Sequence, residues 1–148
     1  MPRIERVAEA VWEGRSASGS GTISARSSGS FVLPYSGQTR VADPAGETGP
    51  EELVAAAHAG CFAMSLAAEL SKLRFEPRRL SVTATCVMDE VEGQGHLVVA
   101  SNLEVKADVP RLDTATFHEA VESADAGCPI SSLIRRSASV SVAAELLV

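Results

Sequence analysis

Residues 50–70 of the chain read PEELVAAAHAGCFAMSLAAEL, an apolar run that opens with a proline and two glutamates. Proline is favoured in the first turn of a helix, and acidic side chains suit the positive end of the helix dipole, so the run predicts a helix that begins at Pro50. Nothing breaks the helical pattern before about Arg74. Because the segment is apolar almost all the way round, we expect a long central helix over residues 50–74.

Strand-like segments precede this helix. Residues 7–13, 21–25 and 31–35 are rich in β-branched and aromatic side chains, and the Gly/Ser-rich run 16–30 is typical of turns between short strands. Pro34 favours an edge strand or a strand end, because proline cannot donate to the ladder. We therefore expect a group of N-terminal strands within residues 5–41.

The region after the helix, residues 79–148, predicts a hairpin, two short helices and a final strand. Two alternating apolar runs flank the turn Gly93-Gln94-Gly95, as in an antiparallel hairpin. A short helix capped by Asp113 or Thr114 follows, then another that starts at Pro129 and runs through Arg135, and residues 140–146 alternate like a strand. Strands grouped with strands and helices with helices predict an α+β fold, with antiparallel sheets packed on the long helix.

Length and composition favour one globular domain over residues 1–148. The chain is 45% apolar and 22% charged, carries a formal charge of -6 and has no run of Lys and Arg. Nucleic acid and anionic membrane are therefore poor partners, and a small-molecule substrate is expected. The longest uncharged window, residues 53–68, falls short of a membrane span, and the N-terminus lacks the apolar stretch of a secretory signal, so we expect a cytoplasmic protein.

Three widely spaced cysteines make no disulfide framework. Cys61 lies on the apolar helix, where it either packs as a small hydrophobe or reacts, with His58 one turn earlier more typical of a hydrogen-bonded core residue. Cys128 stands between a glycine and Pro129 at the cap of a new helix, a position that favours a thiolate. Cys86 alternates with apolar strand residues and is expected in the core.

Metal and cofactor sites are not predicted. The three histidines and three cysteines show no paired ligand spacing of the kind that zinc requires, and no phosphate loop, GxGxxG or GxSxG occurs. The residues by themselves permit a two-thiol site without requiring one.

Three segments together carry a family resemblance. They read PYSGQTR at 34–40, TGPEELVAAAHAGCFAMSLAAEL at 48–70 and AGCPIS at 126–131. The chain thereby resembles the osmotically inducible protein C branch of the organic hydroperoxide resistance family over its whole length. One local departure is Gly49, where the family commonly has Asn, which alters the helix cap and leaves the chemistry unchanged.

The resemblance implies a thiol peroxidase that reduces organic hydroperoxides. The cysteine that matches Cys61 attacks the peroxide and becomes a sulfenic acid, the one that matches Cys128 resolves it to a disulfide, and an external dithiol, lipoyl groups among others, reduces the disulfide. The family's arginine and glutamate fall on Arg40 and Glu51. Cys86 matches no family role.

The implied chemistry agrees with general physical requirements. A thiol near its ordinary pKa of about 8.5 is mostly protonated at neutral pH, so a reactive Cys61 needs a cation beside it. The guanidinium of Arg40 can hold the sulfur and a peroxide oxygen together, while Glu51 fixes its other edge. Arg15 is the rival cation, because the related hydroperoxide-resistance branch draws its arginine from that loop.

The helix spacing leads to a prediction about assembly. Ten residues separate Glu51 from Cys61, which is about 15 Å along a helix axis, so the two belong to different sites of one chain. We expect an obligate, intertwined homodimer in which two copies of the helix cross near Ala56 and each Glu51 serves the partner's cysteine.

Apolar side chains are available to line a pocket for an alkyl tail: Leu53, Phe31, Phe62 and Met64. Two other readings stay open. In one, the chain is a non-enzymatic dimeric ligand-binding or stress-protective domain with bystander thiols; in the other, it exchanges disulfides without peroxide.

Overall fold

A computed structural model describes residues 2–148 of the chain. The structure falls into two compact units, one that ends at Pro50 and one that runs from Glu51 to Val148. Together they make a mixed α+β fold with two small sheets and helices. The expectation of one domain over residues 1–148 stays a prediction.

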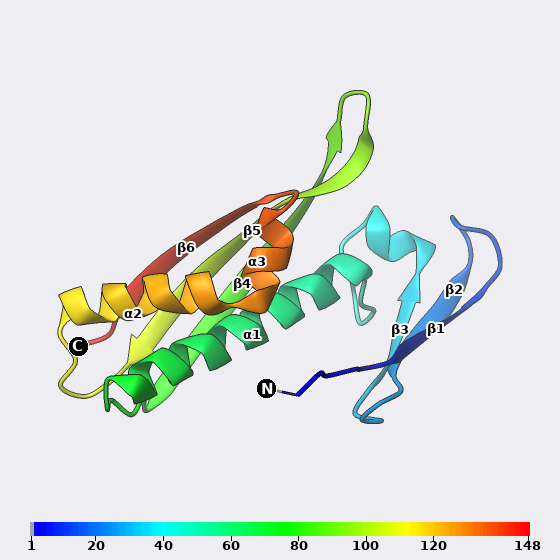
Figure 1. Cartoon of the computed structure of the whole chain (residues 1–148). Helices are drawn as coiled ribbons and strands as arrows, with labels where there is room; N and C mark the ends of the chain where they lie inside the picture. The colour runs from blue at the N-terminus through cyan, green and yellow to red at the C-terminus, as the bar shows by residue number, and fades with distance from the viewer. Residues whose placement is uncertain (1) are drawn as a thin grey trace. The chain divides into compact units, whose positions relative to one another are not determined.

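The N-terminal unit is a three-stranded antiparallel sheet (Figure 1). Its strands are β1 (Ala8–Glu13), β2 (Ser20–Ala25) and β3 (Val32–Ser36), in the order β1-β2-β3, and a short 3-10 helix η1 (Gly37–Arg40) follows. The three predicted strands are thus confirmed. Pro34 lies on β3, an edge strand as its missing N–H requires.

Gly37 fixes how closely η1 approaches the turn between β1 and β2. Its N–H donates to the carbonyl of Gly19 at 3.2 Å. A Cβ at position 37 would lie 2.1 Å from the carbonyl oxygen of Ser16, a distance that no side chain can occupy. A glycine is therefore required for the turn and η1 to pack together.

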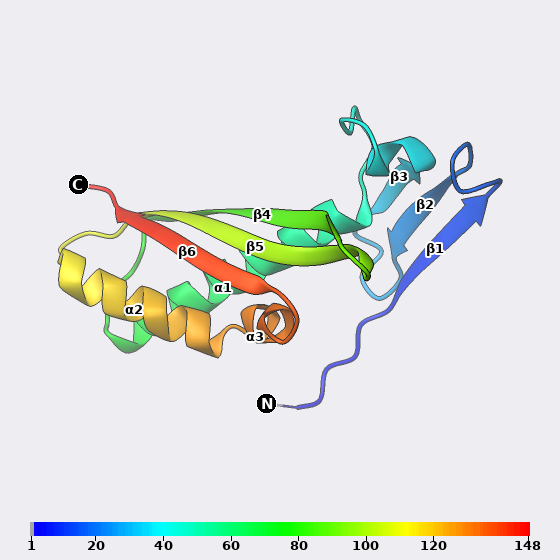
Figure 2. The same cartoon turned by 90° about the horizontal axis from the view of Figure 1, so that it is seen from above.

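The C-terminal unit holds the long helix and a second three-stranded sheet. The elements in chain order are α1 (Pro50–Lys72), β4 (Arg79–Val91), β5 (Gly95–Asp108), α2 (Thr114–Gly127), α3 (Pro129–Arg135) and β6 (Ser139–Leu146). Figures 1 and 2 show α2 and α3 along one face of this sheet. The predicted hairpin is confirmed, and so is the cap at Asp113, whose carboxylate accepts from the N–H of Thr116 at 2.9 Å.

The prediction that the sheets are antiparallel is wrong for the last strand, because β6 pairs with β5 in parallel. Two helices, α2 and α3, connect these strands, so the chain crosses the face of the sheet and returns in the same direction. Parallel neighbours need a crossover of this kind, whereas a two-residue turn suffices for an antiparallel pair. The second sheet, in the order β4-β5-β6, is therefore mixed.

The helix α1 ends two residues earlier than expected. Arg74 adopts a left-handed conformation with φ 64°, and the N–H of Phe75 donates to the carbonyl of Leu70 at 2.9 Å. These features belong to the Schellman motif, which satisfies the last carbonyls of a helix and stops it at Lys72.

Only one stripe of α1 is buried in the chain. His58, Phe62, Leu66 and Leu70 recur every four residues and are fully buried. The three apolar members join the core formed by apolar side chains of β5 and α2. Other apolar side chains of this helix are exposed to solvent, and Met64 is 76% exposed. The helix is long and apolar enough to cross a membrane by length and composition, a test that core helices of water-soluble proteins also pass.

Candidate active site

Two cysteines lie in contact within the C-terminal unit. Cys61 on α1 and Cys128 between α2 and α3 place their Sγ atoms 3.3 Å apart, although 67 positions separate them in the sequence. Cys61 is half-buried and Cys128 is fully buried. A disulfide has an S–S distance of about 2.05 Å, so the two sulfurs need to approach by only ~1.3 Å to form one.

The local fold explains the character of Cys128. This residue is the N-cap of α3, and the backbone N–H of Ser131 donates to its Sγ at 3.5 Å. Burial by itself raises the pKa of the Cys128 thiol, but Ser131, through its backbone and its side chain, outweighs burial together with Cys61 and the backbone of Ile130, and the pKa lies below its ordinary value. The sequence prediction of a thiol at a helix cap is confirmed.

The pKa of Cys61 moves the other way. Burial raises the pKa of this thiol, and the backbone N–H of Ile130 only partly offsets the effect, while the neighbouring Cys128 raises it further. Within residues 51–148, ionisation of the pair thus favours the sulfur of Cys128. Access favours Cys61, because Cys128 has no exposed surface.

A buried histidine of α1 hydrogen-bonds to serines of β5 and α3, and the histidine and the α3 serine lie close in sequence to the two cysteines. The Nδ1 atom of His58 lies 2.6 Å from the hydroxyl of Ser101 on β5, and its Nε2 atom lies 2.7 Å from the hydroxyl of Ser131 on α3. All three residues are fully buried. The expectation of a hydrogen-bonded core histidine is confirmed.

Glu51 and Cys86 are close enough to interact electrostatically in the C-terminal unit. Cys86 is half-buried on β4, and burial raises the pKa of its thiol, with the negative charge of Glu51 adding to the increase. Cys86 is not part of the two-thiol contact, and it is not among the residues of the hydrophobic core, so the expectation that it lies in the core is wrong. Glu51 stands in the first turn of α1, about 15 Å along the helix axis from Cys61.

Arg40 belongs to the N-terminal unit. It ends η1 and lines a cavity of about 290 Å³ with Trp12 and Tyr35 among its neighbours. The rings of these two aromatic residues meet edge to face with centroids 5.2 Å apart. The rival Arg15 lies exposed in the turn after β1 and is not among the residues that line this cavity.

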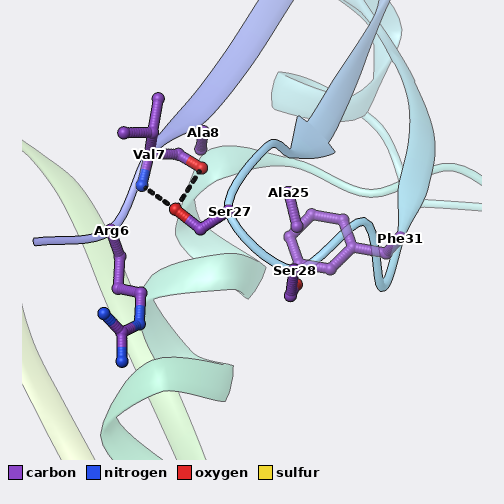
Figure 3. Close-up of a pocket in the computed structure, with 7 residues that line it drawn as sticks. All are labelled: Arg6, Val7, Ala8, Ala25, Ser27, Ser28 and Phe31. Atoms are coloured by element: carbon purple, nitrogen blue, oxygen red, sulfur yellow. Dashed lines mark hydrogen bonds between the residues drawn. The ribbon is translucent and has the colours of Figure 1, made fainter.

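A second cavity of the N-terminal unit, of about 590 Å³, contains none of the four predicted site residues. Phe31, Val7, Ala8 and Ala25 give it an apolar lining, and Arg6 contributes a guanidinium (Figure 3). The hydroxyl of Ser27 accepts from the N–H of Val7 at 2.6 Å at one side of it. Of the four apolar residues predicted to line a pocket, Phe31 lies here, whereas Phe62 is part of the core of the other unit.

Metal-ligand clusters are absent from residues 2–148, where no group of three His, Cys, Asp or Glu side chains is arranged to hold an ion. The chemistry that the C-terminal unit can support is that of its thiols: attack by a sulfur, and closure of a disulfide between two sulfurs already in contact.

Sequence reasoning did not single out Ser101 and Ser131, which complete the network around the thiols. Signals for both exist in the sequence. Ser131 is three residues after the cap Cys128, the position whose N–H an N-cap side chain accepts. Ser101 interrupts an alternating apolar series on β5 that continues with Leu103 and Val105, and a polar residue on a core face needs a partner.

The fold and the site define a class: a mixed α+β protein in which a cysteine of a long helix contacts a second cysteine at the start of a short one. The family model described as "OsmC-like protein" matches residues 43–143, and the chain belongs to this family. The predicted family is thereby confirmed.

Three relatives illustrate the similarity. "Peroxiredoxin OsmC" of Escherichia coli (strain K12) is 36% identical over 132 residues, 89% of this chain and 91% of that protein. "Organic hydroperoxide resistance protein" of Xanthomonas axonopodis pv. citri (strain 306) is 32% identical over 97 residues, 64% and 65% of the two chains. The crystal structure of an organic hydroperoxide resistance protein OsmC from Legionella pneumophila matches with a TM-score of 0.76 at 20% identity, covers 98% of this chain and 99% of that one, and shows the shared fold.

Proposed function

We propose that the chain is a cysteine-based peroxidase that reduces organic hydroperoxides to alcohols. The observation that carries the proposal is the 3.3 Å contact between the sulfurs of Cys61 and Cys128. Two relatives whose names contain peroxiredoxin and organic hydroperoxide resistance support the same chemistry.

The difference in exposure between the two sulfurs supports a different role for each. Cys61 keeps some exposed surface, whereas Cys128 is fully buried, so a peroxide meets Cys61 first. The Cys61 thiolate attacks one oxygen of the O–O bond, which gives Cys61 sulfenic acid and an alkoxide that takes up a proton to leave as the alcohol. Cys128 thiolate then attacks the sulfenic sulfur, the S–S bond forms, the S–O bond breaks, and the hydroxide leaves as water after protonation.

Arg40 supplies the cation that Cys61 needs under this proposal. Burial raises the pKa of the Cys61 thiol, so a positive charge is required to bring the thiolate into the neutral range. A guanidinium stays protonated at every accessible pH and holds two acceptors in its fork, which suits a sulfur and a peroxide oxygen. Arg40→Ala should therefore lower the rate of sulfenic acid formation more than Arg15→Ala, its matched control.

Dimer formation is part of the same proposal. Met64 on α1 is 76% exposed although it lies in the middle of an apolar helix, and most of that helix is open in a single chain. A second copy that crosses α1 near Ala56 would cover this surface and bring its Glu51 to the first copy's Cys61. Ala56→Trp should then disrupt both the dimer and the activity.

The cycle closes with an external dithiol, which reduces the disulfide by thiol–disulfide exchange. A lipoyl-bearing protein is the reductant we propose, acting in the cytoplasm. Each turnover consumes one hydroperoxide and one dithiol, and yields one alcohol, one water and one disulfide of the reductant.

Thiol counting tests the proposal directly. One equivalent of an alkyl hydroperoxide should remove two of the three free thiols and leave Cys86 titratable. Cys61→Ser should abolish the reaction, whereas Cys128→Ser should still form a sulfenic acid that a 1,3-dicarbonyl reagent traps. A wild-type protein that keeps three thiols after the peroxide has been added would refute the peroxidase.

The apolar cavity beside Phe31 supports a second candidate, a non-enzymatic ligand-binding domain. That function predicts saturable binding of an alkyl ligand and no loss of thiols with peroxide. A disulfide exchanger, by contrast, loses two thiols to an added disulfide and none to peroxide, so the same count separates the three functions.

A further inference from the structure

His58 is a buried titratable group that the proposed reaction leaves without a role. Its side chain has no exposed surface, and it lies on α1 one turn before Cys61. Both ring nitrogens have hydroxyl partners, at 2.6 Å on Ser101 and 2.7 Å on Ser131. A ring held at both ends in this way has one orientation only.

Ser131 links this histidine to the resolving thiol. Its hydroxyl contacts His58, its backbone N–H donates to Cys128 Sγ at 3.5 Å, and its hydroxyl is among the groups that lower the pKa of that thiol. A hydroxyl carries one proton. When this proton points to the Cys128 thiolate, the Ser131 oxygen can only accept from His58, so Nε2 of His58 must carry a hydrogen.

The remaining nitrogen then has a defined role as well. A neutral imidazole has one donor and one acceptor, so Nδ1 accepts from the hydroxyl of Ser101. Burial lowers the pKa of His58 more than nearby Asp125 raises it, and Arg135 lowers it further, so the ring is neutral near pH 7. The chain of donors runs from Ser101 through His58 and Ser131 to the sulfur of Cys128.

We propose that His58, as the neutral Nε2–H tautomer, is a positioning residue for disulfide formation, because it directs both donors of Ser131 at Cys128 Sγ and holds that sulfur against Cys61. The inference rests on the proposed peroxidase function. In the step that His58 supports, the Cys128 thiolate attacks the Cys61 sulfenic acid. The S–S bond replaces the S–O bond, and the hydroxide takes up a proton and leaves as water. The first step, attack of Cys61 on peroxide, does not use His58.

Two substitutions of His58 separate hydrogen bonding from packing. The amide of Gln reaches the place of Nε2 and can still donate to Ser131, whereas the amide of Asn reaches only the place of Nδ1 and the Ser101 hydroxyl. His58→Asn and Ser131→Ala should therefore slow disulfide formation about tenfold, equivalent to ~1.4 kcal/mol in the barrier. His58→Gln should stay within about threefold of the wild type. The matched controls, exposed in the structure, are His96→Asn and Ser132→Ala, which should change nothing.

The experiment is a single-turnover reaction with one equivalent of an alkyl hydroperoxide. The rate of sulfenic acid formation, followed with a 1,3-dicarbonyl trap, should be the same in every variant. Sulfenic acid should then accumulate in His58→Asn and Ser131→Ala, because its conversion to the disulfide is slow. The double variant should be no slower than either single one, since both remove the same interaction.

A spectroscopic readout reports the positioning independently of activity. Nitrogen NMR of the reduced protein should show His58 as the Nε2–H tautomer. In a Cys61→Ser/Cys86→Ser background, the thiolate absorbance of Cys128 should titrate at higher pH in Ser131→Ala and His58→Asn than in His58→Gln.

The outcomes distinguish the two proposals. Wild-type disulfide rates in His58→Asn and Ser131→Ala would overturn the role of His58 and leave the peroxidase intact. If His58→Asn and His58→Gln slow disulfide formation equally, packing alone matters, and the proposed positioning role of His58 is overturned. If peroxide consumes no thiol in the wild type, the proposed function fails, and the tautomer and the thiolate titration still decide whether His58 controls Cys128.

Discussion

Oxidation should stabilise the protein, because the disulfide between Cys61 and Cys128 would close a loop that spans 67 positions of the sequence. In the chain-entropy model, a crosslink over a loop of this length removes about 15 cal/mol/K from the unfolded ensemble, which is ~4 kcal/mol at 25 °C. The two sulfurs already lie 3.3 Å apart, so the native fold needs to shift by only about 1.3 Å to form the bond. We therefore expect most of this stabilisation to be retained.

The predicted shift is large enough to measure by calorimetry. For a chain of about this length, 1 kcal/mol shifts Tm by roughly 2–4 °C, so the oxidised protein should melt on the order of 10 °C above the reduced protein. The assay uses a Cys86→Ser variant, so that the one remaining pair can form only one disulfide. Both forms are melted at the same protein concentration, because the Tm of the proposed dimer would depend on that concentration.

The control is the double variant Cys86→Ser/Cys128→Ser, which cannot form the bridge and should show no such increase after the same oxidant. A thiol count on each sample verifies that the bridge formed. If the bridged protein melts at or below the temperature of the reduced protein, native-state strain cancels the loop term, and the idea that the two sulfurs are poised to bond is refuted.

Three other perturbations have defined outcomes. Phe117→Ala should lower the free energy of unfolding by about 3–5 kcal/mol in urea denaturation, because it empties a fully buried site of the core, whereas His118→Ala on the same helix should cost far less. Burial lowers the pKa of His58 below its unfolded value of about 6.5, so the unfolded chain binds a proton first as the pH falls. The free energy of unfolding should therefore be retained above about pH 6.5 and decrease below it. Urea denaturation from neutral to mildly acidic pH should show this decrease, and it should be smaller in His58→Gln. Gly37→Ala places a Cβ 2.1 Å from the Ser16 carbonyl, so amide exchange in η1 and in the turn before β2 should accelerate, while the C-terminal unit keeps its protection.

The sequence predicts the elements of this fold better than their directions. The apolar run after Pro50, the alternation on both sides of the Gly93 turn and the cap at Asp113 are local signals, and each element stands where its signal lies. The direction of β6 is different, because alternation of apolar residues looks the same in a parallel and in an antiparallel edge strand. Only the crossover through α2 and α3 decides it, and the three-dimensional path of a crossover has no local signature.

The site divides in the same way. A thiol at the cap of α3 could be predicted, since Gly, Cys and Pro in succession determine the local backbone. The contact of Cys128 with Cys61 could not be obtained from spacing and was expected only from family resemblance. The partners of His58 come from β5 and α3, which are 43 and 73 positions away along the chain, so no periodicity could have connected them.

The two cysteines are suited to different steps by opposite physical properties. Cys128 has the lower pKa because Ser131 donates to it, yet it has no exposed surface through which a peroxide could reach it. Cys61 is accessible, yet burial and its neighbour keep its pKa high. If ionisation alone set the order of reaction, Cys128 would have to react with the peroxide first. Its sulfur is fully buried, so a peroxide cannot reach it. The proposed order is therefore consistent only if a cation such as Arg40 stabilises the thiolate of Cys61 more than that of Cys128. An Arg40→Ala variant should then slow sulfenic acid formation and raise the pKa of Cys61 more than that of Cys128.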